Sequence, residues 1–446
     1  MMRTTAVVFA ACLGYSMVIL DTTVLNVALP GIATATGASS TQQQWIIDSY
    51  VLTMTALLMA GGGLIDRFGA SRVFRSGIVV FTVASVAGAA CTTAVPLIAA
   101  RAVQGVGGAF LIPAALAVVA QEFPDQAQRG KIIAVVATIT ASPQAFGPTL
   151  GGFLVDTLGW RSVFLLNLPI GVLAMIFARR IQHSVARSRP LDYPGIVLLI
   201  VSLGGLTYGL IQFTQGGWPL SNLLAAVAVA GVAAVVFVVI EKRVRQPLLP
   251  SEVRRSPTVM LYALAGLTIF IVFYGALFAA NLYFQKVLGF GAFTTGLLLI
   301  AGGFPVFALP IIVSKVGHKL HPWALTLAGA VVCTLGTLFG VFATTGHSTE
   351  WVVACLLVVG VGFGILTAPH LTLAMSVSPR GATGVVSALA NSGRQSGYLI
   401  GVALVGTAGI DLAGYHRAIM VAAAAGLVTL VVLIIARPRA VVPVQT

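Results

Sequence analysis

The stretch Ile19–Pro30 reads ILDTTVLNVALP and continues an apolar run that begins at Ala6. The run is long enough to cross a bilayer as one helix, which needs about 20 mostly apolar residues. It nevertheless contains Asp21, and an aspartate near the centre of a membrane helix costs about 2.5 to 3.5 kcal/mol. Acids in such positions usually face a cavity and serve ion or proton movement, so Asp21 is the first candidate functional residue.

The rest of the chain is equally apolar. Of its 446 residues 58% are apolar and only 8% are charged, and the mean hydropathy is +1.02. These values exclude a soluble globular protein and predict an all-α polytopic membrane protein. The first run is too long for a signal peptide and lacks a clear small-residue cleavage site, so we interpret it as a helix. Fourteen transmembrane helices are predicted, at residues 5–28, 44–64, 74–94, 97–119, 132–154, 162–179, 193–213, 222–240, 259–284, 293–314, 322–343, 351–376, 384–409 and 418–436.

Basic residues give the chain a formal net charge of +14, which raises the question of nucleic-acid binding. If the N-terminus is cytoplasmic, 20 of the 25 basic residues fall on the cytoplasmic side of the predicted helices and three on the other side. The positive-inside rule describes this asymmetry. The charge therefore indicates a multi-pass protein of the cytoplasmic membrane with both termini in the cytoplasm, and no nucleic acid is expected as a partner.

Three glycine-containing patterns occur once in each half of the chain. Internal repeats of this kind are how many transporters are built. They predict an N-terminal six-helix bundle over residues 1–180, two inserted helices with cytoplasmic linkers over 181–257, and a C-terminal six-helix bundle over 258–446. The matching pairs are Gly63–Gly69 with Ile311–Gly317, Gly105–Gly107 with Gly360–Gly362, and Gly147 and Gly151 with Gly397 and Gly401.

Two further ionisable residues fall at the depth of Asp21. Counted from the predicted helix ends, Asp48 lies in the outer half of the second helix and Arg101 in the outer half of the fourth. Because an arginine cannot lose its proton, Arg101 needs a carboxylate, a carbonyl or water. We therefore expect a proton-coupling cluster of Asp21, Asp48 and Arg101, in which either Asp21 or Asp48 binds the proton.

Two glycine-rich sequences mark places that are expected to move. At the junction of the second and third helices, an acid among arginines would form either a charge latch or a solvated turn. In the fifth helix, a proline among glycines suits a bend at a moving interface, or else a kinked structural helix. The residues are Gly62, Asp66, Arg67, Gly69 and Arg72 at the junction, and Gly147, Pro148, Gly151 and Gly152 in the fifth helix.

No pattern indicates catalysis or a cofactor. Gly360–Gly364 begins like a dinucleotide-binding loop, but it lies inside a predicted membrane helix. The sequence has no zinc-type histidine spacing, no nucleophile elbow and no Walker-type phosphate loop, and its four cysteines lie singly in apolar stretches. We expect a transport protein and not an enzyme, with no metal or cofactor, driven by the proton gradient.

Five motifs together carry a family resemblance. They are Leu20–Pro30, residues 62–72, Leu97–Ala109, Gly147–Gly152 and Trp160–Gly171. With these motifs the chain resembles the fourteen-helix drug:proton antiporter branch of the major facilitator superfamily over essentially its whole length. The resemblance implies a fold of two six-helix bundles plus two inserted helices. It also implies a proton-coupled antiporter that exports small lipophilic drugs or antibiotics by alternating access, as multidrug efflux proteins do.

Two other functions remain open at this point. One is proton-coupled uptake of a small nutrient, against which the fifth-helix motif argues by resemblance. The other is a membrane sensor or scaffold, which the lack of a sizeable soluble domain disfavours. For the preferred function the partners are a small lipophilic substrate, protons and the lipid bilayer, and a monomer is expected.

Polar residues within the predicted helices are candidates for the substrate cavity. Between Pro257 and Ile410 the sequence has no acid except Glu350, in an outer loop. Without a local acid, Arg394 must line water or contact an anion. His370 is either a titrating group or a satisfied helix contact. The candidates are Asn26, Gln104, Tyr274, Asn281, Tyr283, His370, Asn391, Arg394 and Gln395.

Overall fold

The computed structural model describes residues 2–123, 125–182, 193–215, 219–244, 247–316, 320–343, 349–379, 383–406 and 412–437. Within these residues the chain forms α-helices and one five-residue π-helix, and no strand. A membrane-spanning chain without strands must satisfy its backbone polar groups inside helices, because lipid offers no hydrogen bonds. The prediction of an all-helical fold is confirmed.

The helices divide into three parts along the chain. The first part contains α1 (Met2–Thr36), α2 (Ser40–Phe68), α3 (Ala70–Ala90), α4 (Ala94–Glu122), α5 (Gln126–Leu158), α6 (Arg161–Leu165) and α7 (Asn167–Ala178). The middle contains α8 (Tyr193–Gln215), α9 (Leu220–Glu241) and the short α10 (Ser251–Arg254). The last part contains α11 (Pro257–Leu282) with the π-helix η1 (Tyr283–Val287), α12 (Ala292–Val316), α13 (Pro322–Ala343), α14 (Thr349–Ser376), α15 (Thr383–Gly406) and α16 (Leu412–Ile435).

Eleven spans in the described part of the chain are long and apolar enough to cross a membrane. In this count α6 and α7 form one span, Arg161–Ala178, and α11 forms another together with η1. Three further helices, α2, α5 and α15, fall outside the eleven although they are 29, 33 and 24 residues long. The chain is therefore a polytopic membrane protein, whereas the number fourteen stays a prediction.

Some helix ends were predicted wrongly. α1 continues to Thr36 and includes Pro30, and the hydroxyl of Thr34 donates to the Pro30 carbonyl at 3.1 Å. α2 begins at Ser40, four residues before the predicted start. Its start is fixed by a capping box, in which Ser39 Oγ accepts from the Gln42 amide at 3.2 Å and Gln42 Oε1 accepts from the Ser39 amide at 3.0 Å. Apolar periodicity does not report such caps.

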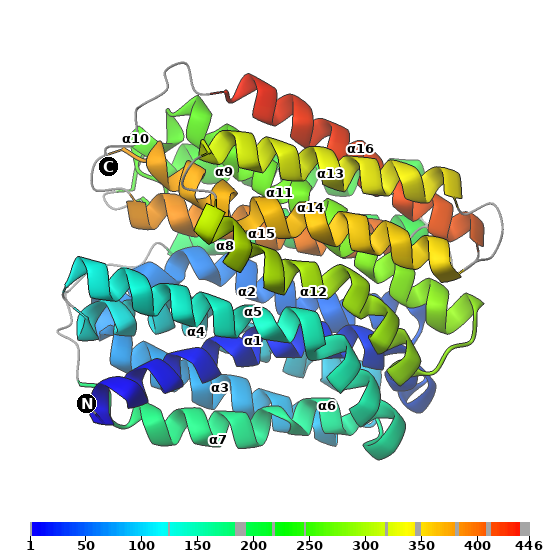
Figure 1. Cartoon of the computed structure of the whole chain (residues 1–446), viewed down its shortest axis with the longest axis horizontal. Helices are drawn as coiled ribbons and strands as arrows, with labels where there is room; N and C mark the ends of the chain where they lie inside the picture. The colour runs from blue at the N-terminus through cyan, green and yellow to red at the C-terminus, as the bar shows by residue number, and fades with distance from the viewer. Residues whose placement is uncertain are drawn as a thin grey trace.

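The helices pack into two groups with a helical pair beside them (Figure 1). One group contains α1 to α7 and the other α11 to α16. Of the pair, α8 packs on α2 and α15, and α9 packs on α8. The groups meet mainly where α5 contacts α12 and where α2 contacts α15. The start of α1 and the end of α16 both lie toward the left of Figure 1, and we call this side the terminal end. The opposite end, where α1 ends and α2 begins, is called the far end.

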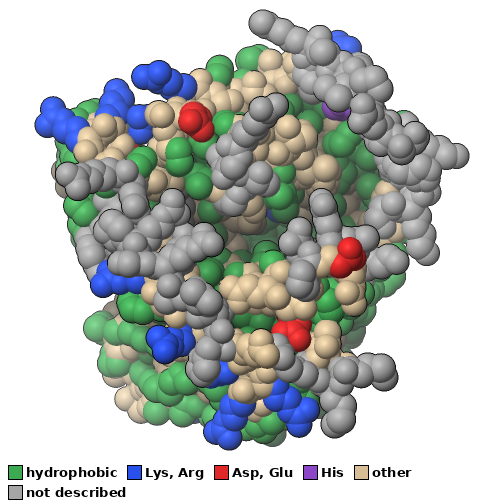
Figure 2. Space-filling model, turned by 90° about the vertical axis from the view of Figure 1, so that its left-hand side faces the viewer, with side chains coloured by type: hydrophobic (Ala, Val, Ile, Leu, Met, Phe, Trp, Pro, Cys, Tyr) green, Lys and Arg blue, Asp and Glu red, His purple; other side chains and the backbone are tan. Residues whose placement is uncertain are grey.

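Figure 2 shows the terminal end. Most of the charged side chains visible on this face are Lys and Arg. Only a few Asp and Glu side chains lie among them, and the face is hollowed near its middle. The molecule therefore presents a basic surface, with a depression in it, at the terminal end.

Candidate functional site

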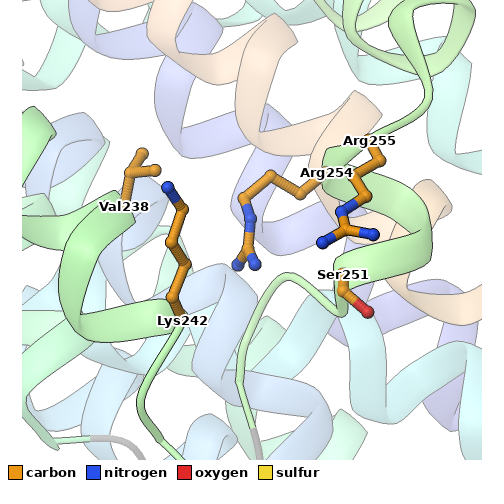
Figure 3. A pocket seen from close by; sticks show the side chains of 5 residues that line it. All are labelled: Val238, Lys242, Ser251, Arg254 and Arg255. Atoms are coloured by element: carbon orange, nitrogen blue, oxygen red, sulfur yellow. The ribbon is translucent and has the colours of Figure 1, made fainter.

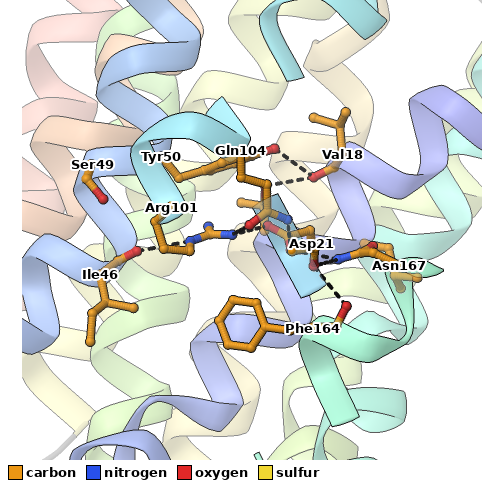
Figure 4. A network of polar contacts seen from close by, with 12 residues as sticks. Val18, Asp21, Ile46, Ser49, Tyr50, Arg101, Gln104, Phe164 and Asn167 are labelled. Atoms are coloured by element: carbon orange, nitrogen blue, oxygen red, sulfur yellow. Dashed lines mark hydrogen bonds and ion pairs between the residues drawn. The ribbon is translucent and has the colours of Figure 1, made fainter. Parts of the chain in front are cut away.

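Asp21 of α1 lies at the centre of a polar network inside the first helix group (Figure 4). Its Oδ2 lies 2.5 Å from Nη1 of Arg101. Its Oδ1 accepts from Nε2 of Gln104 at 2.7 Å and from Nδ2 of Asn167 at 3.0 Å. Arg101 Nη1 also donates to Gln104 Oε1 at 2.8 Å. Because all four side chains are buried, the ion pair is enclosed by α1, α4 and α7.

Arg101 is further held by α2. Its Nε donates to the Ile46 carbonyl at 3.1 Å, and its guanidinium carbon lies 4.2 Å from the centre of the Tyr50 ring. Tyr50 in turn donates its hydroxyl to the Val18 carbonyl at 3.3 Å. A guanidinium over an aromatic face gains a further electrostatic attraction. The positive charge of Arg101 is therefore balanced by Asp21 and further stabilised by the Ile46 carbonyl and the Tyr50 ring. The predicted proximity of Asp21 and Arg101 is confirmed.

Asn167 is a network residue that sequence reasoning missed. Its amide donates to Asp21 and also to Ser85 Oγ at 3.0 Å, and Ser85 donates to the Phe164 carbonyl at 2.8 Å. The available signal was an asparagine close to the start of a predicted span, at the depth of Asp21. Gln104 was predicted to line the substrate cavity, but the structure places its side chain within this buried network.

Asp48 of α2 is not part of the network. Its side chain is 0% exposed, and neither carboxyl oxygen has a hydrogen-bond partner among the described residues. The two aspartates thus lie in opposite environments, since Asp21 has three polar partners, one of which is the oppositely charged Arg101. An isolated ionised carboxylate in an apolar interior is so costly that such groups take up a proton instead. The surroundings of Asp48 therefore favour its neutral form.

The glycines of the fifth-helix motif allow α1 and α5 to approach closely. A Cβ atom on Gly147 would lie 2.9 Å from Thr23 Cβ, and one on Gly151 would lie 3.0 Å from the Val24 Cα. Thr23 Oγ1 also donates to the Pro143 carbonyl at 3.1 Å, and both Pro143 and Pro148 lie within α5. Any larger side chain at these two glycines would push α1 and α5 apart.

The junction of α2 and α3 turns at Gly69, whose φ of 83° is a conformation that side-chain-bearing residues rarely adopt. Arg67 and Arg72 are exposed beside it, and Arg67 lies 5.3 Å from the centre of the Phe68 ring. The surroundings of Gly62 and the side chain of Asp66 lie outside the described residues. The charge latch therefore stays a prediction.

Hydrogen bonds join the two helix groups at the far end. Asn281 Nδ2 donates to the Asn26 carbonyl at 2.9 Å, and Gln285 Nε2 donates to the Val27 carbonyl at 3.2 Å. Two more contacts lie to either side, from Thr149 Oγ1 to the Gly296 carbonyl at 3.0 Å and from Gln44 Nε2 to the Val402 carbonyl at 2.8 Å. We call this set of contacts the far-end seam. Asn26 and Asn281, predicted as cavity residues, belong to the seam.

Glycines bring the backbones of α5 and α12 together along the same seam. A Cβ on Gly152 would meet the backbone of Ala292 and Phe293, one on Gly296 would meet the backbone of Pro148, and one on Gly303 would meet Ala145. Backbone atoms cannot move aside as a flexible side chain can. Gly152, predicted for a moving interface, therefore lies where the two helix groups touch.

A methyl group at Gly152 is expected to loosen the far-end seam. The Gly152→Ala variant forces α5 away from α12, whereas Gly231→Ala is a matched control because nothing lies within 4 Å of that position in α9. The reporter is a cysteine at Asn281, in a Cys91→Ser background shared by both variants. We expect maleimide to label the purified Gly152→Ala protein severalfold faster than the control. Equal labelling rates would show that the seam does not depend on backbone contact.

Arg394 of α15 and His370 of α14 lie together in the second helix group. Arg394 Nη2 donates to the Thr367 carbonyl at 2.8 Å and to His370 Nδ1 at 3.1 Å. Because Nδ1 accepts that bond, the proton of the imidazole is on Nε2, which donates to the Tyr262 carbonyl at 2.8 Å. His370 is therefore a neutral, satisfied helix contact in this conformation, which was one of the two interpretations left open by the sequence.

The remaining cavity candidates have different surroundings. Tyr274 Oη accepts from Gln144 Nε2 at 2.5 Å, a contact between the two helix groups. Tyr283 is buried against Tyr415, with 5.0 Å between ring centres, on the second group alone. Asn391 donates to the Ser387 carbonyl of its own helix at 3.1 Å, and Gln395 is half-buried. Of these four, only Tyr274 is seen to bridge the groups.

A separate pocket of about 610 Å³ lies between α9 and α10 (Figure 3). Its lining is basic, with Lys242, Arg254 and Arg255 beside Val238 and Ser251. Neither α9 nor α10 belongs to the contact between the two helix groups, so this pocket is not part of the seam. Among the described residues, no three His, Cys, Asp or Glu side chains are grouped as a metal ion would require.

The profile of the Major Facilitator Superfamily matches residues 11–402. This match covers the Asp21 network, the seam and Arg394. The chain belongs to the Major Facilitator Superfamily. Members of this superfamily are membrane transporters, so the protein is a transporter and not an enzyme.

Similar superfamily proteins are named as resistance and export proteins. The methylenomycin A resistance protein of Streptomyces coelicolor is 37% identical over 89% of this chain and 84% of its own length. The cephamycin export protein CmcT of Amycolatopsis lactamdurans is 34% identical over 90% of this chain and 84% of its own length. The multidrug resistance protein Stp of Mycobacterium tuberculosis is 32% identical over 89% of this chain and 74% of its own length.

Solved structures confirm the major facilitator fold. A peptide transporter POT in complex with sulfate superimposes with a TM-score of 0.71 at 15% sequence identity, covering 97% of this chain and 94% of that one. The xylose transporter XylE from E. coli, in a partially occluded inward-open conformation, gives 0.66 at 12% identity, over 96% and 97%. At such low identity the likeness extends to the fold alone.

Proposed function

We propose that the protein is a proton-coupled antiporter that exports small lipophilic molecules of the antibiotic type. Relatives with 32% to 37% identity over most of the chain are named for antibiotic resistance and export, which supports the direction of transport. The observation that carries the coupling is the buried, unpartnered carboxyl of Asp48. A carboxyl group that is neutral when buried and ionised when water reaches it gains or loses a proton as the water access of the site changes.

Asp48 is proposed to carry the proton, and Asp21 to hold the site together. Asp21 is bound to Arg101, Gln104 and Asn167, so protonating it would leave Arg101 as an uncompensated buried cation. Asp48 has no such partner to lose. The network therefore fixes α1, α2 and α4 relative to one another, while the proton enters and leaves at Asp48 on α2.

The proposed cycle alternates between two arrangements of the helix groups. With the far end open, Asp48 takes up a proton from outside and substrate is released. The far-end seam then closes, the hollow at the terminal end faces the cytoplasm, and Asp48 loses its proton there as the next substrate binds. The closed seam, the hollowed terminal end and the surroundings of Asp48 support assigning this structure to the stage after closure and before proton release. The membrane potential contributes about 2.3 kcal/mol per charge per 100 mV.

The proposal includes the finer architecture. It has fourteen membrane helices, with a six-helix bundle at residues 1–180, an inserted pair at 181–257 and a second bundle at 258–446. The packing of α8 and α9 outside both helix groups supports this division, as do the lengths of α2, α5 and α15. Both termini are proposed to be cytoplasmic, since Lys and Arg gather at the terminal end.

Export is tested first by growth protection and then by transport. Cells that produce the protein are compared with cells that produce Asp48→Asn, across a panel of antibiotics and cationic dyes. A compound against which only the unchanged protein protects is then followed in proteoliposomes with an imposed proton gradient. We expect it to move against its own gradient and opposite to the protons. Movement in the same direction as the protons would show uptake, and no movement for any compound would favour a sensor.

A further inference from the structure

Arg394 is a buried cation whose partners are all neutral. Its side chain is 8% exposed, and its hydrogen bonds go to the Thr367 carbonyl and to His370 Nδ1. Its guanidinium carbon lies 5.7 Å from the centre of the Phe270 ring. No carboxylate of the described residues forms an ion pair with it, in contrast to Arg101 and Asp21. Since arginine keeps its proton, this part of the membrane interior holds an uncompensated positive charge.

Part of the hydrogen-bonding capacity of the Arg394 guanidinium is unused. Nη2 has two hydrogens, and both are used, one by Thr367 and one by His370. His370 cannot turn away, because its Nε2 is bound to the Tyr262 carbonyl. Nε of Arg394 is buried and has no acceptor among the described residues. Thr367 and His370 thus hold one nitrogen of the guanidinium, and Nε remains available to donate to a ligand.

The hydroxyl of Tyr274 adds a further donor beside this charge. The ring centre of Tyr274 of α11 lies 5.4 Å from that of Phe270, the ring that lies 5.7 Å from the Arg394 guanidinium carbon. Tyr274 Oη accepts from Gln144 of α5, so its own hydrogen is not used in that bond. The pair of Arg394 and Tyr274 therefore touches both helix groups, through the bond from Gln144 to Tyr274. It offers hydrogen-bond donors and one permanent positive charge, and no described carboxylate pairs with that charge.

We infer that Arg394 and Tyr274 bind a carboxylate of the transported molecule, so that the substrates are small organic monoanions with an apolar body. This inference rests on the proposed export function and names its substrate class. A guanidinium binds a carboxylate by charge-assisted, geometrically matched hydrogen bonds. One cation suits one negative charge, which disfavours doubly charged phosphates. Phe270, Phe273 and Phe363 pack together beside this pair, with 4.1 Å between the last two ring centres, and supply an apolar surface for the rest of the ligand.

An anionic substrate also fits the energetics of export. With the cell interior negative, an anion that leaves moves in the direction favoured by the potential, and so does a proton that enters. Each of these charges contributes about 2.3 kcal/mol per 100 mV. Binding an anion between the two helix groups would cancel the lone charge of Arg394 and lower the cost of closing the groups around it.

The inference is tested by binding, without any transport. Equilibrium dialysis of purified protein uses 2-naphthoate, its uncharged amide 2-naphthamide, and a naphthyl trimethylammonium salt of similar size. We expect 2-naphthoate to bind at least about tenfold more tightly than the amide, a difference of about 1.4 kcal/mol, and the ammonium salt to bind most weakly. In Arg394→Gln the preference for naphthoate over the amide should disappear. Arg437→Gln is the matched control, because Arg437 is an exposed arginine over Trp323.

A second variant tests the site with a smaller change to the packing. Tyr274→Phe keeps the ring and removes one hydroxyl, and it should weaken naphthoate binding severalfold while binding of the amide is unchanged. Equal affinities for naphthoate and the amide in the unchanged protein, or an unaltered preference in Arg394→Gln, would overturn the inference. Failure of the export proposal is separate, because the dialysis experiment measures binding without any proton gradient and without an Asp48 variant. If Arg394-dependent binding is found but no compound is driven by a proton gradient, only the export proposal fails.

Discussion

Replacing Asp21 by alanine is expected to lower the free energy of unfolding by about 3 to 5 kcal/mol, because the buried Arg101 charge loses its counter-charge. Gln104 and Asn167 also lose the acceptor that they share. Thermal unfolding of purified protein in detergent measures the change. Asp48→Ala is the matched control, since it removes an equally buried carboxyl that has no hydrogen-bond partner among the described residues.

A companion variant separates loss of charge balance from loss of packing. In Asp21→Ala with Arg101→Met, both charges are gone, so part of the lost stability should return. If Asp21→Ala unfolds at the same temperature as Asp48→Ala, the ion pair does not have the structural role proposed for it. If the double variant is less stable than Asp21→Ala alone, the cost arises from the lost contacts of Arg101 with Tyr50 and Ile46.

Replacing Asp48 by asparagine is expected to abolish coupling to the proton gradient while the protein stays folded. Asparagine has the shape of a protonated aspartate but cannot release a proton. With one proton exchanged per substrate, each pH unit supports about a tenfold substrate ratio, or about 1.4 kcal/mol. In proteoliposomes this ratio should fall to near one in Asp48→Asn, whereas substrate exchange without a gradient should persist.

Asp21→Asn provides the comparison for coupling. It should reduce the amount of folded protein, but the molecules that fold should still respond to the gradient through Asp48. An unchanged substrate ratio in Asp48→Asn, together with a collapsed ratio in Asp21→Asn, would reverse the two assigned roles. The measurement therefore decides which of the two carboxyls exchanges the proton.

Composition and helix depth predicted much of the fold and part of the site. The apolar runs identified a polytopic helical protein, and counting from helix ends placed Asp21 and Arg101 in one layer, where they form an ion pair. Depth along a helix does not say which way a side chain faces. For that reason the sequence could not separate Asp48 from the network.

Other features depend on contacts between distant segments. Gln104 lies one helical turn after Arg101, and both side chains bind Asp21. The sequence predicted a cavity residue instead, because a polar residue in a membrane helix usually indicates a cavity. Asn281 was correctly noticed as polar, but its partner is a backbone carbonyl, which no sequence pattern reports.

The backbone contact of α5 with α12 has a consequence for how such a transporter can evolve. Because Gly152, Gly296 and Gly303 meet main-chain atoms, the sliding surface is independent of the side chains elsewhere in these helices. Substitutions around Arg394 and Tyr274 can therefore change which compound is carried without rebuilding the parts that move. A lineage of these proteins would be expected to acquire new resistances by altering a few cavity residues while its glycines stay in place.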